Sequence, residues 1–94
     1  MKDIGLIFKG KKEELKSKLK KYIFNENQTY NELTLKYNNK WVWIYIYHNN
    51  KGNIYVDVNF SKAFLDAEVK LFTQEMYLLG FIESSEEEEE LIYE

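Results

Sequence analysis

Three residue types are missing from this sequence of 94 residues, which contains no cysteine, no proline and no arginine. Without cysteine the chain has neither a disulfide framework nor thiolate chemistry, which suits a reducing compartment. We therefore expect a cytoplasmic protein. All 13 basic residues are lysine, so the planar bidentate fork that arginine offers to phosphates and guanine edges is absent. This absence disfavours base-specific reading of DNA.

Apolar runs long enough for a signal-peptide core or a membrane span are also missing. The run near the amino terminus extends only from Ile4 to Phe8 and is interrupted by Gly5, so we expect no membrane association. A hydrophobic content of 45% and an aromatic content of 17% nevertheless suffice for a packed interior. We therefore predict one globular domain over residues 1–94, with a flexible acidic tail over residues 84–94.

Signatures of catalysis are scarce. The sequence has no glycine-rich phosphate loop, no nucleophile elbow and no paired serine and histidine. His48 is the only histidine and has no cysteine or second histidine to complete a metal site. Asp57 and Glu32 fall on neighbouring predicted strands, but two carboxylates on one sheet face are common and nothing else supports acid-base chemistry. We therefore predict a non-enzymatic protein with no catalytic residue, no metal site and no cofactor.

Charge is distributed unevenly along the chain. Residues 1–22 carry eight lysines against three carboxylates, whereas residues 65–94 carry ten carboxylates against one lysine. The formal net charge is only −3, so the two ends nearly compensate each other. The molecule is electrically polar, and its acidic end is expected to attract basic surfaces.

Hydrophobic periodicity predicts two amphipathic helices. The first follows Gly10 and has apolar residues at i, i+4, i+7 and i+8. The second is expected to be capped by Ser61 and ended by Gly80. The apolar stripe of the first helix consists of Leu15, Leu19, Tyr22 and Ile23, and that of the second consists of Leu65, Val69, Phe72, Met76 and Leu79.

Alternation of apolar and polar residues predicts the strands, and the polar residues 25–31 predict a turn. The last three strands form an antiparallel meander with one aliphatic face. We therefore predict an α+β fold with an antiparallel three- to four-stranded sheet and two helices packed on one face, in the order strand, helix, three strands, helix and acidic tail. The strands are expected over residues 3–8, 33–37, 41–47 and 54–60.

The segment Trp41–Tyr47 is apolar or aromatic on both sides, because alternate residues of a strand point to opposite faces. One side is aliphatic core, and the other is a ladder of large rings, which are favoured at binding surfaces. The ladder is covered by the chain itself, for example through its first strand and Leu91–Tyr93, by a second copy in a homodimer, or by a partner, which is a protein, a nucleic acid or a small ligand. The partner-binding residues predicted in the strands are Trp41, Trp43, Tyr45, Tyr47, Tyr55 and Asp57.

Five adjacent carboxylates in the tail repel one another, so the ordinary reading of this run is a solvated segment. The alternative is an acidic surface that occupies a basic, phosphate-binding groove of a partner protein, through an attraction that weakens with salt. Under this alternative the run completes the predicted partner-binding site. Its residues are Glu86, Glu87, Glu88, Glu89 and Glu90.

A different class of function remains open. Lys16 and Lys20 of the first helix, together with the ring ladder, form the outline of a small single-strand nucleic-acid-binding module in which bases stack on aromatic side chains. Direct nucleic-acid binding is the less favoured of the two classes, because the tail also supplies charge that neutralises the lysines.

The hairpin at residues 48–56, the helix after it and the acidic run at residues 86–90 resemble the small acidic anti-CRISPR proteins of phages. The resemblance covers residues 33–94 and implies a sheet with helices, no catalytic residues, and carboxylates that block the DNA-contacting groove of a nuclease. The same outline is similar to immunity proteins that neutralise bacterial toxins in the cytoplasm. Our leading hypothesis is therefore a non-enzymatic inhibitor that binds a nuclease or toxin with a basic surface.

Overall fold

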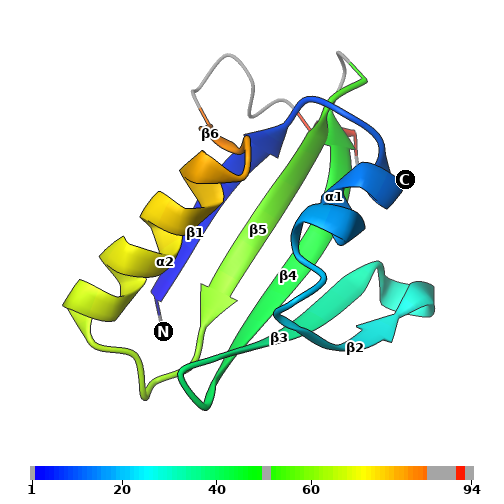
Figure 1. Cartoon of the computed structure of the whole chain (residues 1–94). Coiled ribbons are helices and arrows are strands. Elements are labelled where there is room, and N and C mark those ends of the chain that lie inside the picture. Colours follow the sequence, from blue (N-terminus) through cyan, green and yellow to red (C-terminus); the bar gives the residue numbers. More distant parts are fainter. Residues whose placement is uncertain (1, 50–51, 85–90, 93–94) are drawn as a thin grey trace.

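The computed structural model describes residues 2–49, 52–84 and 91–92 (Figure 1). The predicted tail residues Glu86–Glu90 lie outside the described part of the chain. The described residues have the predicted α+β fold. In chain order the elements are β1 (Lys2–Phe8), α1 (Lys12–Lys18), β2 (Ile23–Asn27), a 3₁₀ turn (Gln28–Tyr30), β3 (Glu32–Tyr37), β4 (Lys40–Asn49), β5 (Ile54–Phe60), α2 (Asp66–Leu78), β6 (Ile82–Glu83) and β7 (Leu91–Ile92).

The strands form one antiparallel sheet in the order β2-β3-β4-β5-β1-β6, and the short β7 pairs with the end of β4. The antiparallel arrangement is confirmed, but the predicted three to four strands are too few. β2 lies largely where the sequence predicts a polar turn, and β6 and β7 lie at the end of the chain. The side chains of β2 and β6 are half-buried or exposed, so burial imposes no apolar alternation on these strands.

The β3–β4 hairpin follows from its turn residues. Asn38 and Asn39 have φ angles of 51° and 61°, and a two-residue hairpin turn needs this left-handed backbone at both positions. Asparagine adopts that conformation more easily than other residues with a side chain. The turn sets Tyr37 opposite Lys40 and thereby fixes which residues of β4 face which side of the sheet.

Both helices pack against the same face of the sheet, as predicted (Figure 1). Leu15 of α1 and Phe72 and Met76 of α2 are fully buried against the aliphatic side of the strands. We call this side the helix face. Its fully or nearly fully buried strand residues are Leu6, Phe8, Leu33, Leu35, Val42, Ile44, Ile46, Ile54, Val56, Val58 and Phe60.

α1 is shorter than the predicted helix, since it ends at Lys18 and three residues of the expected stripe, Leu19, Tyr22 and Ile23, lie beyond it. Tyr22 instead packs its ring against Phe72, with 5.8 Å between ring centroids, and Ile23 begins β2. Tyr22 and Ile23, the i+7 and i+8 residues of the expected stripe, therefore pack against the same core although they are not part of the helix. Neither helix of the described residues combines the length and the apolar composition that a membrane crossing requires.

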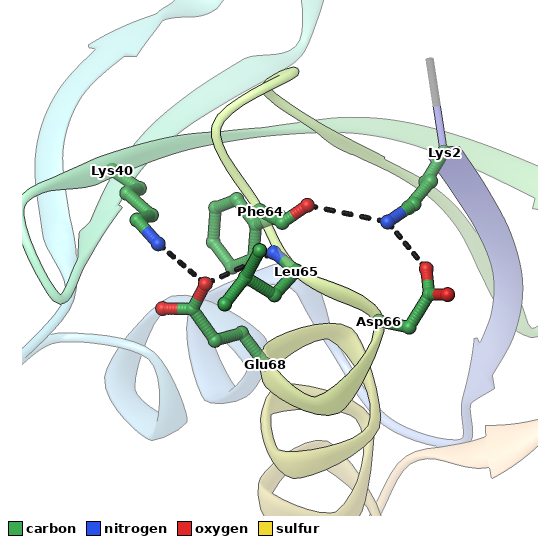
Figure 2. A network of polar contacts seen from close by, with 6 residues as sticks. All are labelled: Lys2, Lys40, Phe64, Leu65, Asp66 and Glu68. Carbon is green, nitrogen blue, oxygen red and sulfur yellow. Dashed lines mark hydrogen bonds and ion pairs between the residues drawn. The ribbon is translucent and has the colours of Figure 1, made fainter.

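Ser61 does not cap α2, which begins at Asp66. The Oγ atom of Ser61 is buried without a hydrogen-bond partner among the described residues. The start of α2 is held by two lysines from the sheet (Figure 2). Lys40 pairs with the Glu68 carboxylate, which also accepts the Leu65 backbone N–H at 2.9 Å.

Lys2 of β1 forms the second part of this arrangement (Figure 2). Its ammonium donates to the Phe64 backbone carbonyl at 3.2 Å and pairs with Asp66. The hydrogen bond from Lys40 and then the Leu65 N–H lower the pKa of Glu68, because both favour the charged carboxylate. The sheet thus fastens α2 at the end where carboxylates also complement the helix dipole.

Candidate functional site

Opposite the helix face, the sheet presents the aromatic residues that the sequence singles out. Residues that are directly paired in a ladder share a face, and Tyr47 of β4 is paired with Tyr55 of β5, whereas Ile46 is paired with Val56 on the helix face. The structure therefore brings six predicted residues to one surface. We call this surface the ring face, and its predicted members are Trp41, Trp43, Tyr45, Tyr47, Tyr55 and Asp57.

No helix of the described residues packs on the ring face, because both helices cover the other side (Figure 1). Trp41 is 36% exposed, and the remaining members are half-buried. The first strand does not lie over the ladder as the self-covering alternative expects, since β1 is paired beside β5 within the sheet. Leu91 and Ile92 pair with the end of β4, and Tyr93 lies outside the described residues.

One aromatic residue of this surface is absent from the sequence prediction. Phe24 lies at an irregularity in the pairing of β2 with β3 and is 64% exposed. Its ring meets the Trp41 ring edge-on at 5.0 Å. The only signal for it in the sequence is an aromatic residue directly before the polar run at residues 25–31, which does not reveal a strand.

Phe24 completes a shallow hollow at the β2 side of the ring face. The hollow has a volume of about 200 Å³ and is lined by Phe24, Asn25, Thr34, Trp41 and Trp43. We call it the Phe24 hollow. The Lys36 ammonium lies 5.4 Å from the Trp41 ring centroid and 5.9 Å from that of Phe24. These distances are typical of cation–π contacts, so rings of this surface already hold one cation.

The middle of the ring face is acidic. Tyr45 is paired with Glu32 on β3 and with Asp57 on β5, so the two carboxylates lie on either side of its ring. A hydrogen bond to Glu32 is the main cause of a raised pKa of the Tyr45 phenol, and burial adds to it. Neither carboxylate forms an ion pair with a described residue. We call these three residues the acidic row.

The two carboxylates of the acidic row lie on different strands. Glu32 and Asp57 are separated by β4, which places their backbones about two interstrand spacings, or roughly 10 Å, apart. The Tyr45 side chain lies between them. Elsewhere in the described chain, no group of three or more histidine, cysteine or acidic residues is arranged to hold a metal ion.

Lys16 of the first helix lies away from the rings. It pairs with Glu26 of β2 at 2.9 Å, and Lys21, which lies beyond the end of α1, reaches Glu75 of α2 at 3.5 Å. α1 packs on the helix face, so Lys16 and the ring ladder lie on opposite faces of the sheet. A single strand of nucleic acid would therefore have to pass around the edge of the sheet to contact both α1 and the ring ladder.

No protein-family model matches the chain, and no curated protein or solved structure is significantly similar to it. The resemblance to anti-CRISPR and immunity proteins therefore rests on features of the sequence alone.

Proposed function

We propose that this protein binds another protein through the ring face and inhibits it without catalysis. The observation that carries the proposal is the aromatic surface that no described helix covers, in which Phe24 and Trp41 remain 64% and 36% exposed. Exposed apolar surface of this kind usually marks an interaction site. Tryptophan and tyrosine also supply most of the affinity at protein interfaces, because each buries a large area at a small entropic cost.

The charge of the ring face supports a partner with a basic surface. The acidic row contributes two carboxylates that form no ion pair with a described residue, and the tail contributes five further glutamates to the same chain. Charges of this kind mainly set the rate of approach and the choice of partner, whereas buried rings set the lifetime of the complex. We propose a nuclease or toxin whose nucleic-acid-binding groove is basic, met in the bacterial cytoplasm.

The nucleic-acid-binding alternative receives less support from the placement of charge. A single-strand binder joins stacking rings to a basic groove that follows the phosphate backbone. Here Lys36 is the one cation that is in contact with the described rings Phe24 and Trp41, and the neighbouring row is acidic.

Affinity capture from bacterial lysate followed by binding kinetics tests the proposal. Trp43→Ala removes a ring from the ring face, and Leu78→Ala removes an apolar side chain that is 84% exposed on α2. We expect Trp43→Ala to raise the dissociation rate of the purified captured protein about tenfold or more. Leu78→Ala should leave it within about twofold. Equal kinetics for the two variants would overturn the proposal.

The tail and the nucleic-acid alternative are tested separately. Replacing residues 86–90 with glutamine should slow association and flatten its salt dependence, because long-range attraction is lost. A gel-shift assay with single-stranded DNA and RNA should give no shift at low or moderate salt. A shift that Trp43→Ala abolishes would instead establish a nucleic-acid-binding module.

A further inference from the structure

The ring face carries two different features side by side along β4. Trp43 is a wall of the Phe24 hollow, and Tyr45 is the centre of the acidic row. Residues i and i+2 of a strand project from the same side and are about 7 Å apart. The Phe24 hollow and the acidic row are therefore adjacent on one surface.

The hollow suits an apolar side chain. Three of its five lining residues are the aromatic rings of Phe24, Trp41 and Trp43, and Phe24 and Trp41 keep exposed area that an incoming group can bury. Thr34 and Asn25 provide the remaining lining. A single apolar or aromatic side chain placed here would contact ring faces on several sides, which is the arrangement that anchor residues use at protein interfaces.

The acidic row suits a cation. Glu32 and Asp57 are half-buried, and neither forms an ion pair with a described residue. Two carboxylates of the same sign on one surface attract a basic group of a partner and favour it over a neutral or acidic one. The contacts of Lys36 with the Trp41 and Phe24 rings show that aromatic side chains of this face can accept a lysine in a cation–π contact.

We infer that the ring face docks an extended segment of a partner protein that carries an apolar or aromatic anchor and, two residues away, a lysine or arginine. The anchor fills the Phe24 hollow, and the basic side chain lies over Tyr45 between Glu32 and Asp57. This inference rests on the proposed function and specifies the chemistry of the partner. The spacing of two residues matters, because in an extended chain the intervening side chain points away from the surface.

Blocked tripeptides provide the probe. The peptide tryptophan-glycine-arginine has both features at the inferred spacing. Tryptophan-glycine-citrulline replaces the charge with a neutral group of nearly the same shape, and tryptophan-arginine-glycine moves the charge by one residue. Titration into ¹⁵N-labelled protein is followed through the indole N–H resonances of Trp41 and Trp43, which belong to the protein alone.

The affinity for tryptophan-glycine-arginine should exceed that for either control peptide about fivefold, as for a partly exposed ion pair. In the double variant Glu32→Gln with Asp57→Asn, the three peptides should bind alike. Glu13→Gln, at an exposed position on α1, should retain the wild-type preference. Thermal unfolding of each variant verifies that the fold is kept, which these isosteric changes favour.

A wild-type protein that binds all three peptides equally, or none of them, would overturn the inference. So would a preference for arginine that survives in the double variant. The proposed function is judged by different data, namely the effect of Trp43→Ala on a captured partner. Partner binding that depends on Trp43 but is indifferent to Glu32→Gln and Asp57→Asn would leave the function standing and remove only the inferred cation site.

Discussion

Replacing a phenylalanine by alanine on each face of the sheet distinguishes residues that stabilise the fold from residues that contribute to the binding surface. Phe72 on α2 is fully buried and contacts the rings of Tyr37 at 5.2 Å and Phe60 at 5.7 Å. Phe72→Ala should therefore lower the free energy of unfolding by about 3–5 kcal/mol, the range for a deleted core phenylalanine.

Phe24→Ala makes the identical change where the residue is 64% exposed. A phenylalanine side chain has roughly 200 Å² to bury, so about 70 Å² is lost, which at ~25 cal/mol/Å² gives at most about 2 kcal/mol. The two variants should thus differ by about 1 kcal/mol or more in unfolding free energy. For a domain of this size, that corresponds to a difference of at least about 4–8 °C in the melting temperature.

Urea unfolding followed by far-UV circular dichroism measures both variants against the wild type. The dependence of the unfolding free energy on urea should keep its slope, since each variant exposes nearly the same area on unfolding. If Phe24→Ala costs as much as Phe72→Ala, then Phe24 is a structural residue and the Phe24 hollow is part of the core. The assignment of the hollow to partner binding would then fail.

Three further outcomes are expected. At Gly5 a Cβ atom would lie 2.3 Å from the Tyr55 phenol oxygen, so Gly5→Ala should displace that ring and lower stability by about 1–3 kcal/mol in a melting experiment; an unchanged melting temperature would show that the ring moves freely. Because the pKa of Glu68 is lowered from its ordinary 4.5, its contribution to stability is present above that pH and is lost as pH falls through the folded value, so Glu68→Gln should flatten the pH dependence of unfolding in acid; a dependence as steep as that of the wild type would contradict this. The raised pKa of Tyr45 means that its contribution is complete below pH 10 and is lost as pH rises, and an ultraviolet or NMR titration of Glu32→Gln should show this pKa moving back toward 10.0.

The strands with one aliphatic side were predictable from the sequence because burial on one face imposes alternation. In the segment Trp41–Tyr47 and in the strand from Ile54 to Phe60, every second side chain is a core residue. The structure places these side chains of both strands in one core. The residues between them must then point to the opposite face of the sheet. Most of the candidate surface was therefore predictable without knowing the fold. Gly80 also ends the second helix region as expected, with a φ of 104°.

The edge strands and the length of α1 were not predictable in the same way. β2 has polar residues on both faces, and its position depends on ladder hydrogen bonds to β3 and on the ion pair of Glu26 with Lys16. No pattern in the sequence indicates that these residues interact. Phe24 was missed for this reason, since its membership of the ring face depends on where β2 attaches.

The first and last pairings of the sheet differ greatly in how far apart their residues are along the chain. Tyr37 meets Lys40 across a tight turn, whereas Lys2 meets Phe60 only after the whole meander has been made. On the ribosome, β1 therefore emerges early but waits without its neighbour until β5 has been synthesised, and the hairpins between them form first. We therefore expect β1 to stay unpaired during synthesis for longer than the strands of the β3–β4 hairpin, and so to be open to mispairing for longer.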